Sequence, residues 1–166
     1  MFEGPFAPVD WGTTAASGTG KNRHCLRMLT RLLARYRPEV LLLQDTSEEI
    51  RRAARIRSLH VAIKAFAEDE GVRVVLVARG DVRKTFSYLD APTKHQIAVA
   101  ISRHVPVFER LLPRVRKPWM SEDARMGIFD AAGLVFAYYD GGAQKRGRAR
   151  RYKSGFQENE GDDDWI

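Results

Sequence analysis

Two aspartates lie where a carboxylate could do chemistry. Asp45 closes the stretch 39–45, whose residues 40–43 are an apolar run of four, and Asp130 lies within the mostly apolar residues 128–134. An acid after a buried strand stands where open α/β sheets bind ligands. An acid among apolar helical residues is costly to bury unless it is paired or binds a cation. The small residues 131–133 would let the helix approach the sheet and bring Asp130 towards Asp45.

Two facing carboxylates would suit Mg²⁺ or Mn²⁺, which prefer oxygen ligands. The alternative for Asp130 is a structural role, paired with an arginine. Asp123 lies seven residues before Asp130, about 10 Å along a straight helix. Because metals in a two-metal site lie only about 4 Å apart, both acids cannot hold one ion through such a helix. Glu122 and Asp123 are therefore expected in the first helical turn after Ser121, unless the preceding turn folds back.

The surrounding pattern predicts alternating helices and strands, which is typical of an α/β protein with a largely parallel central sheet. The apolar run before Asp45 is expected to be a strand buried on both faces. The expected elements are helices at 23–36 (with Asn22 as a cap), 47–70, 92–103 and 121–139, strands at 39–45 and 72–77, a strand or turn at 82–86, and a turn at 108–112.

The charge of the chain favours a polyanionic partner. Lys and Arg outnumber Asp and Glu by 28 to 21, and the pI is near 9.9. Nucleic acid is the first expectation and the surface of an anionic membrane is the second. The alternative is a basic protein that binds neither. The single cysteine, Cys25, excludes a disulfide framework and fits a cytoplasmic location. Neither a membrane-spanning run nor a signal peptide is evident, and residues 141–166 are expected to be a disordered basic-then-acidic tail.

Other motifs fail on their spacing. Residues 17–22 have Asn22 where a phosphate loop needs Ser or Thr after the lysine, and Ala15 where it needs glycine. Residues 9–14 resemble the phosphate turn of actin-like ATPases, but a loop and a helix follow instead of further strands. We therefore expect Asp10 to be exposed at a strand end. The four histidines have no metal-ligand spacing.

Four motifs, in this order, resemble those of RuvC-like Holliday-junction resolvases. They are Leu41-Leu-Leu-Gln-Asp-Thr46, Val82-Arg-Lys-Thr-Phe86, Ala91-Pro-Thr-Lys-His-Gln-Ile-Ala98, and Ser121-Glu-Asp with Phe129-Asp-Ala-Ala132. The resemblance covers roughly residues 6–140 and is closest to bacterial RuvC-like proteins that have an Asp-Trp-Gly strand. It implies an RNase H-like fold, a mixed five-stranded sheet flanked by helices, in which acids hold two Mg²⁺ ions that activate water against a phosphodiester.

The resemblance also implies roles for individual residues. Asp45 matches the second acid of such sites and Asp130 the last one, with Asp123 or Glu122 as a further ligand. Lys94 matches the basic residue that opens the preceding helix, where it would steady the scissile phosphate. Arg83 falls near a second basic position.

The chain departs from this family in two places. The family begins with a strand that carries the first catalytic Asp, whereas this sequence begins within the hairpin that follows, so the domain is expected to be N-terminally truncated. Gly127 stands where the family has another acid. A late start codon, a fragment and an inactive relative all remain open explanations.

The leading hypothesis is a Mg²⁺- or Mn²⁺-dependent endonuclease that cuts branched DNA, with Asp45, Asp130, Asp123 and Lys94 as catalytic residues. The rival is a protein of the same fold that binds branched or duplex nucleic acid without cutting it, and a third reading is a basic scaffold in a protein complex. A homodimer is left open. The expected phosphate contacts are Arg51, Arg52, Arg55, Arg83, Arg114, Arg116 and Lys117.

Overall fold

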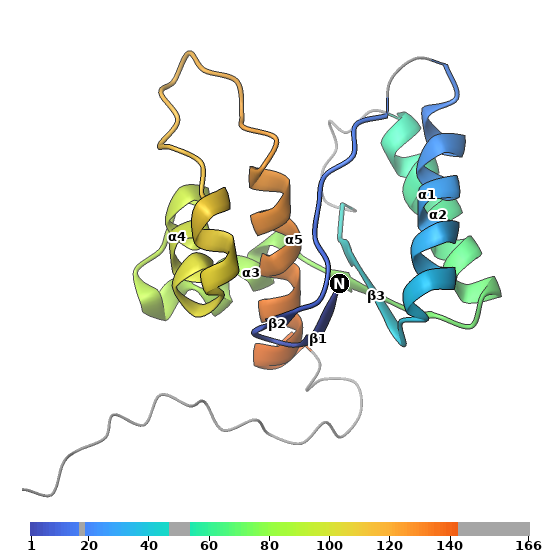
Figure 1. The fold of residues 1–166 in the computed structure, drawn as a ribbon, viewed down its shortest axis with the longest axis horizontal. Helices are drawn as coiled ribbons and strands as arrows, with labels where there is room; N and C mark the ends of the chain where they lie inside the picture. The colour runs from blue at the N-terminus through green and yellow to red at the C-terminus, as the bar shows by residue number, and fades with distance from the viewer. Residues whose placement is uncertain (17–18, 47–53, 143–166) are drawn as a thin grey trace, which may run out of the picture.

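The computed structural model describes residues 1–16, 19–46 and 54–142. Its helices and short strands confirm the α/β class (Figure 1). The strands are β1 (Phe2–Gly4), β2 (Ala7–Pro8), β3 (Val40–Gln44) and β4 (Arg73–Val77). The helices are α1 (Lys21–Tyr36), α2 (Ala54–Asp69), α3 (Arg79–Thr85), α4 (Lys94–His104) and α5 (Met126–Ala137), with 3-10 turns η1 (Ser87–Leu89) and η2 (Pro106–Leu111) and a π-helical turn η3 (Tyr138–Gly142).

β3 and β4 form the parallel pair that the two apolar runs predict. Val40 lies opposite Arg73, and the pairing continues past β3, where the Asp45 amide donates to the Val77 carbonyl at 2.8 Å. Helix α2 makes the crossover between these strands, as parallel pairing requires. β1 and β2 form a separate antiparallel pair.

The prediction that β3 is buried on both faces is wrong. All five of its residues are half-buried, and Leu76 of β4 is 50% exposed. Within the described residues, β3 and β4 each have one hydrogen-bonded neighbour, so each has an open edge. An edge strand loses the cover that a further strand would provide.

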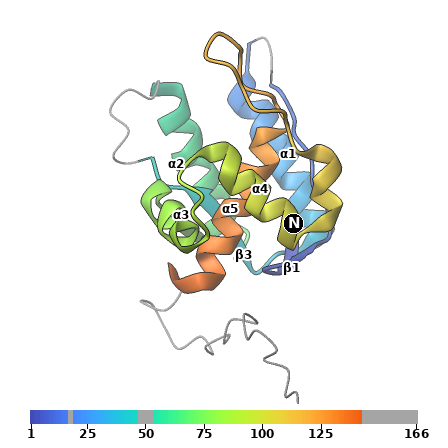
Figure 2. The same ribbon diagram turned by 90° about the vertical axis from the view of Figure 1, so that its left-hand side faces the viewer.

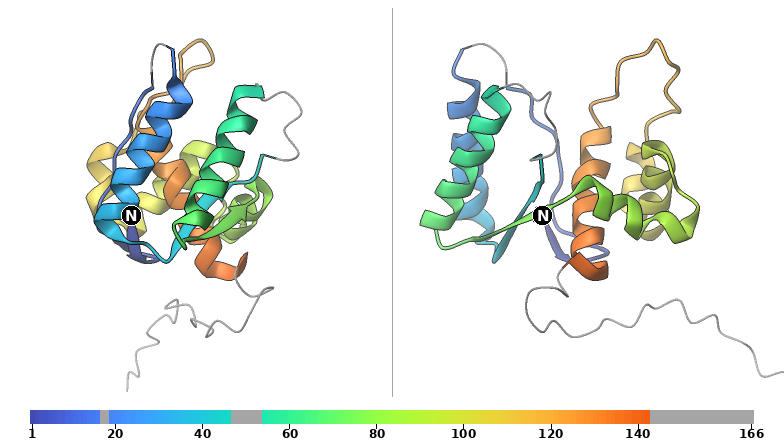
Figure 3. Two further views of the ribbon diagram at one scale, coloured as in Figure 1. Left: turned by 90° about the vertical axis from the view of Figure 1, so that its right-hand side faces the viewer. Right: turned by 180° about the vertical axis from the view of Figure 1, so that it is seen from behind.

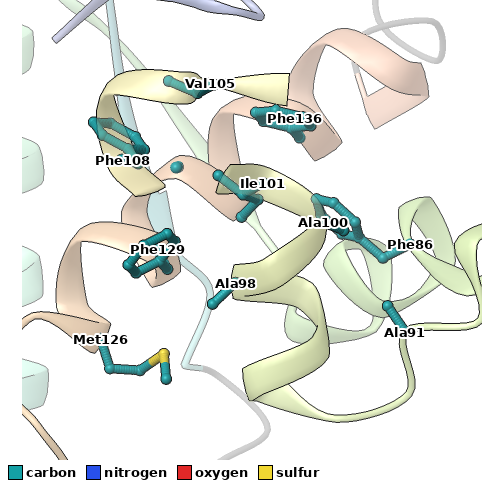
Figure 4. Close-up of a cluster of buried hydrophobic side chains, with 11 residues drawn as sticks. Phe86, Ala91, Ala98, Ala100, Ile101, Val105, Phe108, Met126, Phe129 and Phe136 are labelled. Carbon is teal, nitrogen blue, oxygen red and sulfur yellow. The ribbon is translucent and has the colours of Figure 1, made fainter. Parts of the chain in front are cut away.

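Two hydrophobic cores lie on opposite sides of this strand pair. The smaller core is centred on Leu33, Ala67 and Val72 and joins α1 and α2 to one face of the strands, with Leu41 packed against it. The larger core is formed by α3, α4, η2 and α5, and its largest buried side chains are Phe86, Ile101, Val105, Phe108 and Phe129 (Figure 4). Helix α5 lies between β3 and the pair α3 and α4 (Figures 1 and 3).

Residues 82–85 belong to helix α3 and Phe86 is its C-cap, which corrects the predicted strand or turn. The Phe86 amide donates to the Val82 carbonyl at 3.3 Å, and both side chains pack into the larger core. Residues four apart share one face of a helix. In a strand, residues 82, 84 and 86 would all point to the same face. Residue 84 is an exposed lysine.

The close approach expected for residues 131–133 is made to helix α3. A Cβ built at Gly133 would lie 3.1 Å from Cγ1 of Val82, which is tighter than ordinary packing. Glycine therefore lets the backbones of α5 and α3 approach each other.

Local signals place the start of α4 correctly and misplace those of α1 and α5. Thr93 forms a capping box with Gln96 at the start of α4. Helix α1 begins after Gly20, at φ 80°, and not after Asn22. Helix α5 begins at Met126, five residues after Ser121, because the Asp123 carboxylate accepts from the Arg125 amide at 2.9 Å and holds a turn there.

The N-terminal segment connects the two cores. The rings of Phe2 and Trp11 lie 6.2 Å and 5.4 Å from the ring of Phe108 in the larger core. Asp10, which we expected to be exposed, is half-buried and accepts a hydrogen bond from the Tyr36 hydroxyl at the end of α1. The segment runs alongside α1, between that helix and α5 (Figures 1 and 2).

No helix in the described part of the chain is long and apolar enough to cross a membrane. The tail prediction for residues 141–166 falls, apart from its first two residues, outside the described residues.

Candidate functional site

A pocket of about 430 Å³ lies where α3, α4 and α5 meet the carboxyl end of β3. Its apolar lining comes from the larger core, including Val82, Ile97 and Phe129. Its polar lining comes from five segments of the chain: Gln44, Arg79, Arg83, Lys94, Glu122 and Asp130. We call these six residues the polar pocket. Ligand pockets commonly combine an apolar wall with a few convergent polar groups of this kind.

Lys94 is the central cation of the polar pocket. Its Nζ lies 2.5 Å from Glu122 Oε1 and 2.8 Å from Asp130 Oδ2. The capping box of Thr93 fixes the backbone here and makes Lys94 the first residue of α4. Partial burial lowers the pKa of the Lys94 ammonium, but the hydrogen bonds that it donates to Asp130 and Glu122 outweigh burial and raise that pKa above its ordinary value.

Asp130 is exposed on the pocket side of α5. The sequence placed it among apolar residues, yet its neighbours Phe129 and Ala132 turn into the core while Asp130 faces the pocket. It has a cationic partner, as the structural alternative required, but that partner is Lys94 and not an arginine.

The turn before α5 folds back, so Glu122 and Asp123 are not first-turn acids. Glu122 reaches Lys94, 28 residues earlier in the chain. Asp123 instead pairs with Arg125, whose Nη2 lies 2.6 Å from Asp123 Oδ2. Hydrogen bonds from the Arg125 side chain and amide lower the Asp123 pKa to about 2. Asp123 is not among the residues that line the pocket.

Asp45 lies next to the pocket lining, but Gln44 is the residue that reaches it. Successive side chains of a strand point to opposite faces. Leu41 packs against the core of α1 and α2, so the continued pleat directs Asp45 to that face and Gln44 to the α5 face. This register separates Asp45 from Asp130, and their assignment to one metal site stays a prediction.

The predicted nucleic-acid contacts fall in three places. Arg83 lines the pocket. Arg55 donates to Asn22 Oδ1 at 3.1 Å, between the starts of α1 and α2. Arg114, Arg116 and Lys117 are exposed between η2 and α5. Arg51 and Arg52 lie outside the described residues.

Sequence reasoning missed Arg79 and Gln44. Arg79 and Arg83 are four residues apart, so they share a face of α3. A helical interpretation of residues 79–85 would have found this pair. No local signal singles out Gln44, because its role depends on the register of β3.

Within the described residues, the side chains of the polar pocket do not by themselves form a complete set of Mg²⁺ ligands. Among the described residues, no group of three or more His, Cys, Asp or Glu is placed to hold a metal. The two carboxylates of the polar pocket converge on the Lys94 ammonium, which occupies the place between them. The arrangement is better suited to holding an anion beside Arg79 and Arg83.

Neither the protein-family models nor the curated proteins compared with this chain match it. The likeness to RuvC-like resolvases therefore depends on the four motifs alone.

Proposed function

We propose that this protein binds nucleic acid, with the polar pocket as a contact point for the phosphodiester backbone. The observation that supports it most is the pair Arg79 and Arg83 at the pocket. Both side chains are exposed, and neither pairs with a carboxylate within the described part of the chain. Guanidinium groups of this kind suit bidentate contact with phosphate oxygens.

The acids of the pocket do not cancel this charge. Glu122 and Asp130 share Lys94, so the ammonium partly neutralises both carboxylates. The two arginines lie on the neighbouring helix α3 and face the same opening. With a chain charge of +7, the pocket would take part in a mainly electrostatic interaction with branched or duplex DNA.

The RNase H-like architecture is part of this proposal. The parallel unit β3–α2–β4, with a later helix opened by Lys94 and α5 presenting Asp130, supports it, whereas the described residues form two two-stranded sheets and not the five-stranded mixed sheet that the resemblance implies. DNA is the partner that such an architecture favours.

The test is fluorescence anisotropy with a labelled four-way DNA junction and a duplex of equal length, in EDTA at several salt concentrations. The variant is Arg79→Gln/Arg83→Gln. The matched control, Arg103→Gln/Arg110→Gln, removes two exposed arginines from outside the pocket. We expect the pocket variant to reduce the slope of log Kd against log salt by about two, one for each lost phosphate contact. No salt-dependent binding, or an equal loss in both double variants, would refute the proposal.

Metal-dependent cleavage, the activity that the resemblance implies, is the second candidate, and it requires Mg²⁺ to displace the Lys94 ammonium from between Glu122 and Asp130. The test is cleavage of the same junction in millimolar Mg²⁺. If the pocket is the active site, Asp130→Asn abolishes cleavage, whereas Asp45→Asn has the smaller effect because Asp45 does not line the pocket. An equal loss of cleavage in both variants would instead support the metal site predicted from sequence. Intact cleavage in both variants would exclude Asp45 and Asp130 as catalytic residues.

A further inference from the structure

A loop that combines basic and exposed apolar side chains projects from the larger core. Residues 114–120, here called the basic loop, are all exposed and include three cations and no acid. They rise beyond the ends of α4 and α5 (Figure 1). The loop also exposes three large apolar side chains: Val115, Trp119 and Met120.

Both ends of the basic loop are attached to the first turn of α4. The His95 Nε2 atom contacts the carbonyl of the buried Pro113 at 2.9 Å, just before the loop. Just after it, Glu122 pairs with Lys94. Consecutive residues of one helix therefore hold the two ends together, and the loop adjoins the polar pocket through Lys94.

A tight turn within the loop exposes Trp119. The Met120 amide donates to the Lys117 carbonyl at 3.0 Å, and Pro118 occupies the second position of this turn, where proline is favoured. Trp119 is 78% exposed, the largest fraction among the large hydrophobic side chains of the described residues. Lys117 Nζ lies 5.5 Å from the centre of its ring.

We propose that the basic loop binds unpaired nucleotides, with Trp119 stacked on a base and Arg114 and Arg116 on the flanking phosphates. This inference rests on the proposed function, because it takes nucleic acid as the partner, and it adds a preference for single-stranded segments. Proteins that bind single strands combine cationic side chains that follow the backbone with aromatic rings that stack on bases. A base inside a duplex is already stacked and offers no face to the indole.

The attachment of the basic loop beside the pocket favours nucleic acid over an anionic membrane. Arg79 and Arg83 line the pocket, and the loop that carries the other three cations is attached at both ends to the first turn of α4, which supplies Lys94 to the pocket. A flexible polyanion could contact both sets at once. A membrane surface would use only the projecting tip.

The experiment compares the affinity of the full chain for a labelled oligothymidine and for a blunt duplex of equal length. The variants are Trp119→Ala and Trp119→Phe. Tyr88→Ala, which removes another exposed aromatic side chain, is the control. We expect Trp119→Ala to weaken binding of the single strand by roughly 10-fold and binding of the duplex by less than about 2-fold. Trp119→Phe restores most of the single-strand affinity, because a phenyl ring still stacks.

The outcomes separate this inference from the proposed function. If the wild type binds duplex but Trp119→Ala leaves single-strand affinity unchanged, the stacking inference is wrong and the proposed function stands. If the wild type binds neither DNA, both fail. Binding to vesicles of phosphatidylserine and phosphatidylcholine that is lost in Trp119→Ala, without DNA binding, would overturn the inference in favour of a membrane contact.

Discussion

Lys94 is the central residue of the polar pocket, because its ammonium group pairs with two carboxylates from different segments. Glu122 comes from the turn before α5, and Asp130 from the helix itself. Without the ammonium, two like charges would face each other across the pocket. An exposed ion pair contributes little to stability by itself, so the main effect of Lys94 is on the local charge and geometry.

Removing that ammonium should create a cation site. In Lys94→Met, the carboxylates of Glu122 and Asp130 would lose their shared partner, and a hard divalent cation could take its place. We expect millimolar Mn²⁺ to raise the Tm of Lys94→Met and not that of the wild type. The control is Lys64→Met, which breaks the surface pair with Glu68 on α2. A Tm rise of equal size in both variants would show that the effect is not specific to the pocket.

Asp123 should account for part of the loss of folding stability at low pH. Its folded pKa of about 2 lies below the ordinary value of 3.8, so its contribution to stability is complete above pH 3.8 and is lost as the pH falls through about 2. Asp123→Asn keeps an acceptor for the Arg125 amide but removes the charge. The Tm of the wild type should therefore exceed that of Asp123→Asn at pH 5, and the difference should shrink towards pH 2. A difference that is constant over this range would contradict the assignment.

At the scale of elements, the contact between α3 and α5 sets the width of the pocket. Val82 and Gly133 face each other across it, and Arg79, Arg83 and Asp130 lie on the same two helices. Any residue that separates these helices also separates the basic and acidic groups of the pocket. Their close approach is therefore a structural requirement of the site.

Gly133→Ala tests that approach. Alanine favours a helix by about 1 kcal/mol over glycine, but its Cβ would lie 3.1 Å from Val82 Cγ1. Val82 is β-branched and restricted in χ1, so we expect the contact to prevail and the variant to lose about 1 kcal/mol of unfolding free energy. In a Val82→Ala background, the same substitution should become neutral or stabilising. Chemical denaturation of the four proteins in this cycle measures both effects, and an unchanged penalty in the Val82→Ala background would exclude Val82 as its cause.

For the molecule as a whole, the N-terminal segment is one of the links between the two cores. It packs Trp11 on Phe108 at one end of the larger core and hydrogen-bonds Asp10 to Tyr36 of α1. The Met1 amino group donates to the Asp10 carbonyl at 2.7 Å, which closes the segment on itself. The strand pair is connected to the same side of the molecule by Arg73 of β4, whose Nη2 donates to the Tyr138 hydroxyl after α5 at 2.7 Å.

Tyr36→Phe should loosen this link without disturbing either core. The hydrogen bond from Tyr36 lowers the Asp10 pKa, so the carboxylate is stabilised above its ordinary pKa of 3.8 and the bond's contribution is lost as the pH falls below it. We expect faster amide hydrogen exchange at Val9, whose amide donates to the Met1 carbonyl. Amides of β3 and β4 should keep their protection. Equal acceleration at both places would show global destabilisation instead.

The sequence by itself determined the elements whose causes are local. The apolar runs of β3 and β4 and the Thr93–Gln96 capping box of α4 are visible in a few adjacent residues, and they lie where the pattern predicts. Composition alone also predicts a polyanionic partner, since the excess of basic residues needs no fold to be counted. Helix α3 was missed because its one apolar pair, Val82 and Phe86, is too short a pattern to distinguish a turn from a helix.

Only the tertiary structure decided which side chains meet. Gln44 faces the pocket and Asp45 does not, because the packing of Leu41 against α1 and α2 sets the face of every residue in β3. Lys94, Glu122 and Asp130 come together through the packing of α4 on α5 and the fold-back of the turn before α5. These pairings depend on distances between segments far apart in the chain, and local sequence patterns contain no information about such distances.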